Sequence, residues 1–192
     1  MTKHGQFLLL SIQEFSDWLD AEPVDRKIFV IQNHHTWKPA YAQFNGNNHM
    51  QMLDGMKAYH QSIKFSDIAQ NITIFPDGKI AICRPFNVIP AGIKGANANG
   101  ICIENIGNFD AGGDVMSELQ KDAIIAVNAL LIKAFNLTVD TDCVVYHHWF
   151  DLNTGVKTWG SGSTKTCPGT NWFGGNTKEA CEKYFLPLIK NY

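Results

Sequence analysis

The chain has 192 residues, which suits one domain with a substantial buried core. Apolar residues make up 45%, charged residues 18%, and the formal net charge is -2, which is typical of a globular protein and argues against a disordered or fibrous chain. The chain has no long basic run, so nucleic acid is not an expected partner, and no apolar stretch is long enough for a membrane span.

Helices and strands are predicted in a mixed order along the chain. Ser11 and Glu14 have the spacing of a capping box and predict a helix over 11–19. Pro76-Asp77-Gly78 predicts a hairpin between two short strands. In chain order, the further predicted elements are a strand over 27–33, a helix over 49–63, strands over 71–75 and 79–84, a loop over 85–99, a strand over 101–106, a helix over 117–135, a strand over 143–146, a loop over 150–175 and a helix over 178–189.

This order predicts a mixed α/β fold, with a central, mostly mixed sheet flanked by helices. The five cysteines are an odd number and contain no Cys-x-x-Cys pair, which argues against a disulfide framework and a redox motif. Most of them lie in apolar segments and are expected to be buried. Cys167 differs, because it follows Lys165 and Thr166 in a polar, turn-rich segment.

Two predicted strands end in paired histidines, His34-His35 and His147-His148. Adjacent residues on a strand point to opposite faces, so at most one histidine of each pair can enter a shared site. Two histidines and the Cys167 thiolate would supply three ligands and leave a fourth position for water, which is the pattern of a catalytic zinc site. The competing interpretation is that both pairs are incidental strand ends.

Five segments follow one another along the chain: Val-Ile-Gln-Asn-His-His-Thr at 30–36, Phe-Pro-Asp-Gly-Lys-Ile at 75–80, Gly-Ile-Cys-Ile-Glu-Asn-Ile-Gly-Asn-Phe at 100–109, Val-Val-Tyr-His-His at 144–148 and Lys-Thr-Cys-Pro-Gly at 165–169. In this order they resemble the zinc-dependent N-acetylmuramoyl-L-alanine amidases, a family that includes phage lysozyme-like amidases and peptidoglycan recognition proteins. The resemblance covers about Ile28 to Pro168. The resemblance implies one domain over 1–192, with an N-terminal helical extension at 1–25 and a catalytic core at 26–192.

The resemblance also implies a site for one catalytic Zn²⁺, with His34, His148 and Cys167 as ligands. It implies that Lys165 is catalytic and places Glu104 near a catalytic glutamate of some members. The chain departs from the family at Gln70, where many members have a catalytic tyrosine. A cleft wall for the glycan is expected in the glycine- and asparagine-rich loop and after the strand at 101–106. The candidate substrate-binding residues are Ala91, Gly92, Lys94, Asn97, Asn108 and Phe109.

The implied activity is that of a hydrolase in peptidoglycan catabolism, cutting the bond between the muramoyl lactyl group and L-alanine in the cell wall, with peptidoglycan or muropeptides as partners. A non-catalytic peptidoglycan-binding module and a zinc peptidase acting on the stem peptide remain as alternatives. So do the roles of endolysin, autolysin and recycling enzyme.

No signal peptide is visible, so a bacterial or phage-encoded protein that stays cytoplasmic until released is expected. The sequence does not specify the oligomeric state. Trp149, Trp159 and the glycines of the segment 149–166 could line a groove or form a structural insertion, and the sequence leaves both open.

Overall fold

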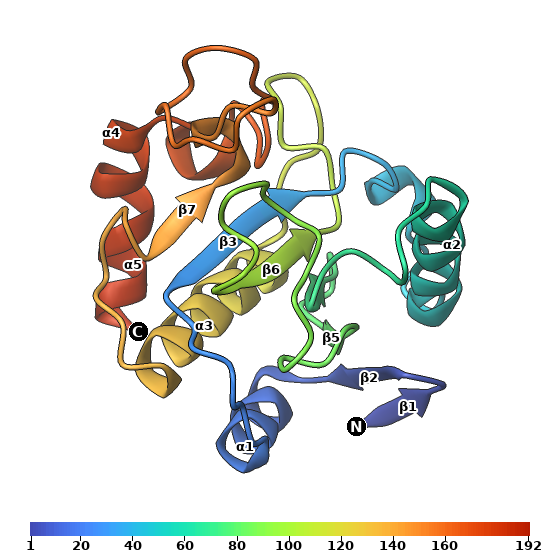
Figure 1. Ribbon diagram of the computed structural model, residues 1–192. Coiled ribbons are helices and arrows are strands. Elements are labelled where there is room, and N and C mark those ends of the chain that lie inside the picture. The colour runs from blue at the N-terminus through green and yellow to red at the C-terminus, as the bar shows by residue number, and fades with distance from the viewer.

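The computed structural model describes all residues, 1–192, and shows a seven-stranded mixed sheet (Figure 1). The strand order is β1-β2-β5-β4-β6-β3-β7. Strands β4, β6, β3 and β7 are parallel to one another, whereas β1, β2 and β5 pair antiparallel, including β5 with β4. The strands are β1 (Thr2–His4), β2 (Phe7–Leu10), β3 (Val30–His35), β4 (Ile72–Ile74), β5 (Ile80–Ile82), β6 (Gly100–Asn105) and β7 (Val144–Tyr146). The predicted mixed α/β class is confirmed.

Helices cover both faces of this sheet. The larger core packs α1, α3 and the C-terminal helices against one face, and a smaller core packs α2 against part of the other (Figure 1). The helices are α1 (Ile12–Ala21), α2 (His49–Ser62), α3 (Glu118–Ala134), α4 (Lys178–Ala180) and α5 (Leu186–Asn191), with a π-helical turn at Cys181–Phe185 between the last two. No helix combines the length and apolar character needed to cross a bilayer.

The N-terminal segment corrects one expectation. The capping box of Ser11 and Glu14 is present and begins α1 as predicted. However, residues 1–25 are not simply a helical extension, because β1 and β2 precede α1 and β2 pairs with β5. Phe7 and Leu10 of β2 are buried in the two cores. The segment therefore belongs to the same sheet as the rest of the chain.

Strand β3 lies between β6 and β7. Its successive side chains point alternately to the two faces of the sheet. Ile31 packs in the larger core, and Asn33 exchanges two side-chain hydrogen bonds, of 2.9 and 3.1 Å, with Asn128 of α3. These residues face α3, so Gln32 and His34 face the opposite side of the sheet. Because both asparagines are fully buried and paired, they fix β3 against α3 directly behind His34.

The segment 149–166 is a folded structural insertion. Trp149 is fully buried, and its indole N–H donates to the carbonyl of Asn176 at 2.7 Å. Trp159 packs on the Trp149 ring, with 5.1 Å between ring centroids. Asp151 accepts hydrogen bonds from the backbone of Thr154 and Ser163, which closes the segment on itself. The structure thus favours the structural interpretation of these tryptophans.

Candidate active site

Three side chains that are far apart in the sequence meet on the face of the sheet opposite α3. His34 Nδ1 lies 3.2 Å from His147 Nδ1 and 3.5 Å from Cys167 Sγ. The ligand atoms of the three residues all lie within 4.8 Å of one another, and the cluster is largely buried. His34 is at the end of β3, His147 directly follows β7, and Cys167 comes from the loop beyond the insertion.

Strand register explains why His147 joins the cluster. Asn33 pairs with Tyr146, so His34 and His147 continue side by side on the same face. The structure brings His147, and not the expected ligand His148, into the cluster. His148 Nδ1 donates to the carbonyl of Lys165 at 2.7 Å, and its backbone N–H donates to the carbonyl of Cys167 at 2.7 Å. His148 therefore holds the loop that carries Lys165 and Cys167.

Two separations within the cluster and its donor chemistry fit a zinc ion. Zinc bonds of about 2.0–2.1 Å to nitrogen and about 2.3 Å to sulfur place tetrahedral ligand atoms about 3.3–3.6 Å apart. The 3.2 and 3.5 Å separations agree with this spacing. Burial lowers the pKa of His34 well below its usual value and that of His147 to about 4, so both rings are neutral and keep a lone pair for a metal.

Cys167 has surroundings that suit a thiolate ligand. Burial and the nearby Glu104 carboxyl raise the pKa of Cys167 well above its usual value when no cation is present. The amide N–H of His35 opposes this effect by donating to Sγ at 3.4 Å, and the Lys165 charge acts in the same direction. A bound metal ion would add a much larger favourable charge, because a coordinating thiol is deprotonated outright.

Glu104 extends the row of side chains across the sheet. It pairs in register with His34 on one side and with Thr73 on the other. Its Oε1 lies 3.9 Å from His34 Nδ1, and its Oε2 is buried without a hydrogen-bond partner. Burial raises the pKa of Glu104 to about 8, although the Lys165 charge partly offsets this rise. A carboxyl with a pKa in this range is suited to both accepting and donating a proton.

Lys165 lies at the exposed edge of the same site. Its charge lowers the pKa values of Glu104, His34 and His147, which places the ammonium group close to all three. Lys165 forms no ion pair, so its charge is free to act on a bound molecule. Asp110 stabilises the loop that carries Lys165 by accepting hydrogen bonds from Thr166 and Thr170.

These side chains lie in a cleft of about 890 Å³. His34, Glu104, His147, Lys165 and Cys167 all line it. Further lining residues come from the turn after β3, from α2 and the segment that follows it, and from the 90–97 loop. A cleft of this size, with a few converging polar groups, is typical of a ligand-binding site.

Two of the six predicted substrate-binding residues, Ala91 and Gly92, line this cleft. A side chain at Gly92 would collide with Gln32 Oε1 and Cys102 Sγ, because an added Cβ would lie 2.3 and 2.7 Å from them. The absence of a side chain therefore lets the loop pack closely against the sheet. Gln32 secures the loop further by accepting from the Ile93 amide at 3.0 Å and donating to the Ala96 carbonyl at 2.9 Å.

The other four predicted binding residues do not line the cleft, because each has a structural partner elsewhere. Lys94 donates to the carbonyl of Asn153, and the side-chain oxygen of Asn97 accepts from the Gly92 amide. The side-chain oxygen of Asn108 accepts from the amide of Asp110 in a turn. Phe109 is 2% exposed and belongs to the larger core. Their polarity or aromatic character in the sequence did not distinguish loop packing from ligand contact.

Gln70, the residue at the position of the family tyrosine, lies in the cleft wall and is fully buried. Its Nε2 donates to Thr73 Oγ1 at 2.8 Å, and its Oε1 has no partner. Gln70 therefore continues the row formed by Thr73, Glu104 and His34.

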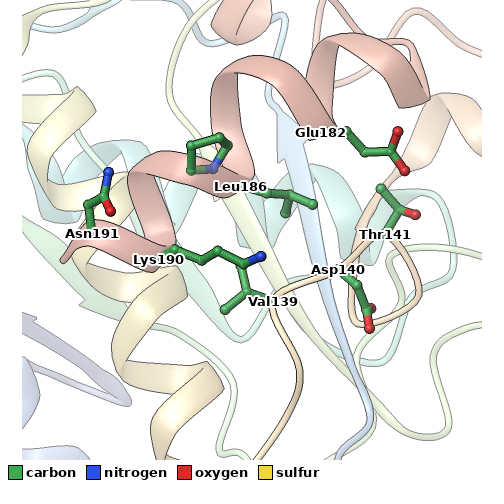
Figure 2. Close-up of a pocket in the computed structure, with 8 residues that line it drawn as sticks. Val139, Asp140, Thr141, Glu182, Leu186, Lys190 and Asn191 are labelled. Carbon is green, nitrogen blue, oxygen red and sulfur yellow. The ribbon is translucent and has the colours of Figure 1, made fainter.

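A second pocket, of about 350 Å³, lies between the segment before β7 and α5 (Figure 2). Its charged groups are Asp140, Glu182 and Lys190, and no histidine or cysteine lines it. Residues 139–141 precede β7, whereas His147 follows it, so this pocket is at the opposite end of the strand from the cluster. The cluster of histidines and cysteine that could hold a metal ion is therefore in the cleft and not in this pocket.

The sequence profile of the N-acetylmuramoyl-L-alanine amidase family matches residues 24–170. This protein belongs to that family. Its predicted membership is thereby confirmed, and it is placed among proteins that hydrolyse or bind peptidoglycan. None of the curated proteins matches the chain.

Solved structures of the same fold cover most of the chain. The N-acetylmuramoyl-L-alanine amidase LysC from Clostridium intestinale URNW is 22% identical, with 85% of this chain and 90% of that chain covered and a TM-score of 0.58. Drosophila PGRP-LB is 20% identical, with 86% and 85% covered and a TM-score of 0.64. A PGRP-LB variant solved with tracheal cytotoxin is 20% identical, with 85% of each chain covered and a TM-score of 0.61. At these identities the likeness shows the fold.

Proposed function

We propose that this protein is a zinc-dependent hydrolase that cleaves the amide bond between the muramoyl lactyl group and L-alanine in peptidoglycan. The observation that carries the proposal is the convergence of two neutral imidazoles and a cysteine beside Glu104 and Lys165 in an open cleft. Family membership supports the choice of bond. His34, His147 and Cys167 would hold the ion, with His147 replacing the ligand expected from the sequence.

A zinc ion held there supplies a Lewis acid and lowers the pKa of a bound water towards neutrality. Glu104 takes a proton from the attacking water as its oxygen adds to the lactyl carbonyl carbon, and returns that proton to the alanine nitrogen as the carbon–nitrogen bond breaks. Lys165 stabilises the negative charge that develops on the carbonyl oxygen. The position of the Glu104 carboxyl supports this role, since its Oε1 lies 3.9 Å from His34 Nδ1 beside the cluster.

The direct test is to incubate the protein with intact peptidoglycan, with and without a zinc chelator, and to identify the products by mass spectrometry. We expect free stem peptides that begin with L-alanine, lost on chelation and restored by zinc. Binding without cleavage by the zinc-loaded protein would instead establish a peptidoglycan-binding module. Cleavage within the stem peptide would establish a peptidase.

Lys165→Ala should lower kcat by about 10²–10³-fold, because this is the cost of removing one group that stabilises a developing oxyanion. The zinc content should stay at the wild-type level, since Lys165 is not in the ligand cluster. The measurement combines turnover of a soluble muropeptide with metal analysis. Lys121→Ala, a change on the exposed side of α3, is the matched control. Equal turnover in both variants would remove Lys165 from the mechanism.

A further inference from the structure

Three of the side chains that line the cleft are aromatic and exposed. Trp37 and Tyr59 are 53% and 63% exposed, and Phe65 is 36% exposed. We call these three residues the aromatic wall, and all of them line the cleft. Trp37 lies two residues beyond His35, whereas Tyr59 is near the end of α2 and Phe65 follows that helix. Large aromatic side chains usually gain stability by burial, so the exposure of three of them in a single cleft requires an explanation.

The backbone of Trp37 strengthens this observation. Its φ is 57°, in the left-handed region that bulky residues seldom adopt. Hydrogen bonds on both sides hold the turn, since the amides of Thr36 and Trp37 donate to the carbonyls of Asn105 and Gly107, each at 3.0 Å. The fold thus accepts backbone strain and leaves half of the indole in solvent. Strain of this kind is concentrated at functional sites.

His60 adds a fixed hydrogen-bond donor beside the aromatic rings. Its Nδ1 accepts from the Ala69 amide at 3.1 Å, so the proton of the neutral ring is on Nε2. The ring stacks on Phe65, with 5.5 Å between centroids and 14° between planes. His60 also lines the cleft. The aromatic wall therefore combines flat apolar surfaces with a polar donor.

We propose that Trp37 and Tyr59 form a subsite that binds the ring face of a sugar of the glycan strand. This inference rests on the proposed function, because it assigns the orientation of the same substrate in the cleft. A pyranose presents C–H groups on its faces and hydroxyls at its edge, which matches exposed rings flanked by the His60 donor. The charged and polar groups that a stem peptide needs are available from other lining residues, namely Asp110, Lys165 and Thr166.

The chain contains a matched control for Trp37. Trp159 also has a left-handed backbone, with φ 58°, and is 41% exposed. A lysine lies over each ring: Lys38 over Trp37 at 5.3 Å and Lys157 over Trp159 at 4.2 Å. Trp159 belongs to the structural insertion and does not line the cleft. Tyr184 is the matched control for Tyr59, because it is 46% exposed and lies on the C-terminal helical segment.

The test uses the two halves of the substrate as separate ligands. Neither half contains the bond that the protein is proposed to cleave, so binding is measured without hydrolysis. The disaccharide N-acetylglucosaminyl-N-acetylmuramic acid and the free stem peptide are each titrated by ligand-observed NMR into the zinc-loaded protein and its Trp37→Ala, Tyr59→Ala, Trp159→Ala and Tyr184→Ala variants. Trp37→Ala and Tyr59→Ala should each weaken disaccharide binding about tenfold, the order expected for one lost aromatic contact. Stem-peptide affinity should not change, and the control variants should bind both ligands like the wild type.

Unchanged disaccharide affinity in Trp37→Ala and Tyr59→Ala, or no disaccharide binding by the wild type, would overturn the subsite. A loss of stem-peptide affinity instead would show that the aromatic wall holds the peptide. The two proposals fail separately, because the product assay on intact peptidoglycan does not depend on these variants. Hydrolysis by the wild type without an effect of Trp37→Ala on sugar binding contradicts the subsite alone. Sugar binding that depends on Trp37, in a wild type that cleaves nothing, contradicts the hydrolase alone.

Discussion

Replacing His147 with alanine should remove zinc and abolish hydrolysis, whereas replacing His148 should leave zinc bound. The Nδ1 atoms of His147 and His34 are 3.2 Å apart, and His147 is one of three residues in the cluster. Its loss should weaken zinc binding by more than the roughly 10–100-fold that the loss of a hydrogen bond to a ligand costs. Metal content by mass spectrometry and turnover of a soluble muropeptide measure the two effects.

His148→Ala is an informative control because the residue is adjacent in sequence and has the same side chain. It should retain stoichiometric zinc and lose activity only through its hydrogen bond to the Lys165 carbonyl. The reverse result, with zinc lost from His148→Ala and kept by His147→Ala, would restore the ligand expected from the family resemblance. It would also require a strand register different from the pairing of Asn33 with Tyr146.

Glu104→Gln should lower kcat by about 10²–10⁴-fold, the usual contribution of a positioned general acid–base. Glutamine keeps the size of the side chain but cannot take up the proton of the attacking water. KM and zinc content should stay close to wild type, because Glu104 is not in the ligand cluster. Steady-state kinetics on a soluble muropeptide and metal analysis separate these quantities.

Glu118→Gln, an exposed glutamate at the start of α3, provides the comparison. If both variants turn over at the wild-type rate, Glu104 is only a buried carboxyl and another group must move the proton. If Glu104→Gln loses zinc, the carboxyl supports the metal site and its part in proton transfer would not be separable by this change.

Much of the fold could be predicted from local patterns. The capping box at Ser11 and the Asp77-Gly78 hairpin act through nearby backbone groups, so their signals are contained in a few residues. Strand β1 carried no such signal, because all three of its residues are exposed. Strand β2 has only four residues and could not be assigned from its apolar run.

The candidate site was predicted in part, because its chemistry is local but its geometry is not. The side-chain types of His34, Cys167 and Lys165 and their motifs could be recognised along the chain. The choice between His147 and His148 depends on the pairing of β7 with β3, which joins residues more than a hundred positions apart. The exposed aromatic wall was missed for a related reason, since a tyrosine in an amphipathic helix resembles a core residue until its neighbours are known.

The wide separation of His34, His147 and Cys167 along the chain links metal binding to folding. In the unfolded chain these donors are dispersed, and they converge only when β3, β7 and the loop beyond the insertion have assembled. A metal ion at this cluster would bind the native state almost exclusively, and its binding free energy would add to the free energy of unfolding. At a free metal concentration 100 times the dissociation constant, this linkage contributes about 2.7 kcal/mol. The three side chains of the proposed metal site would then stabilise the parallel part of the sheet, so both the proposed activity and the stability of the folded protein would depend on the availability of the metal ion.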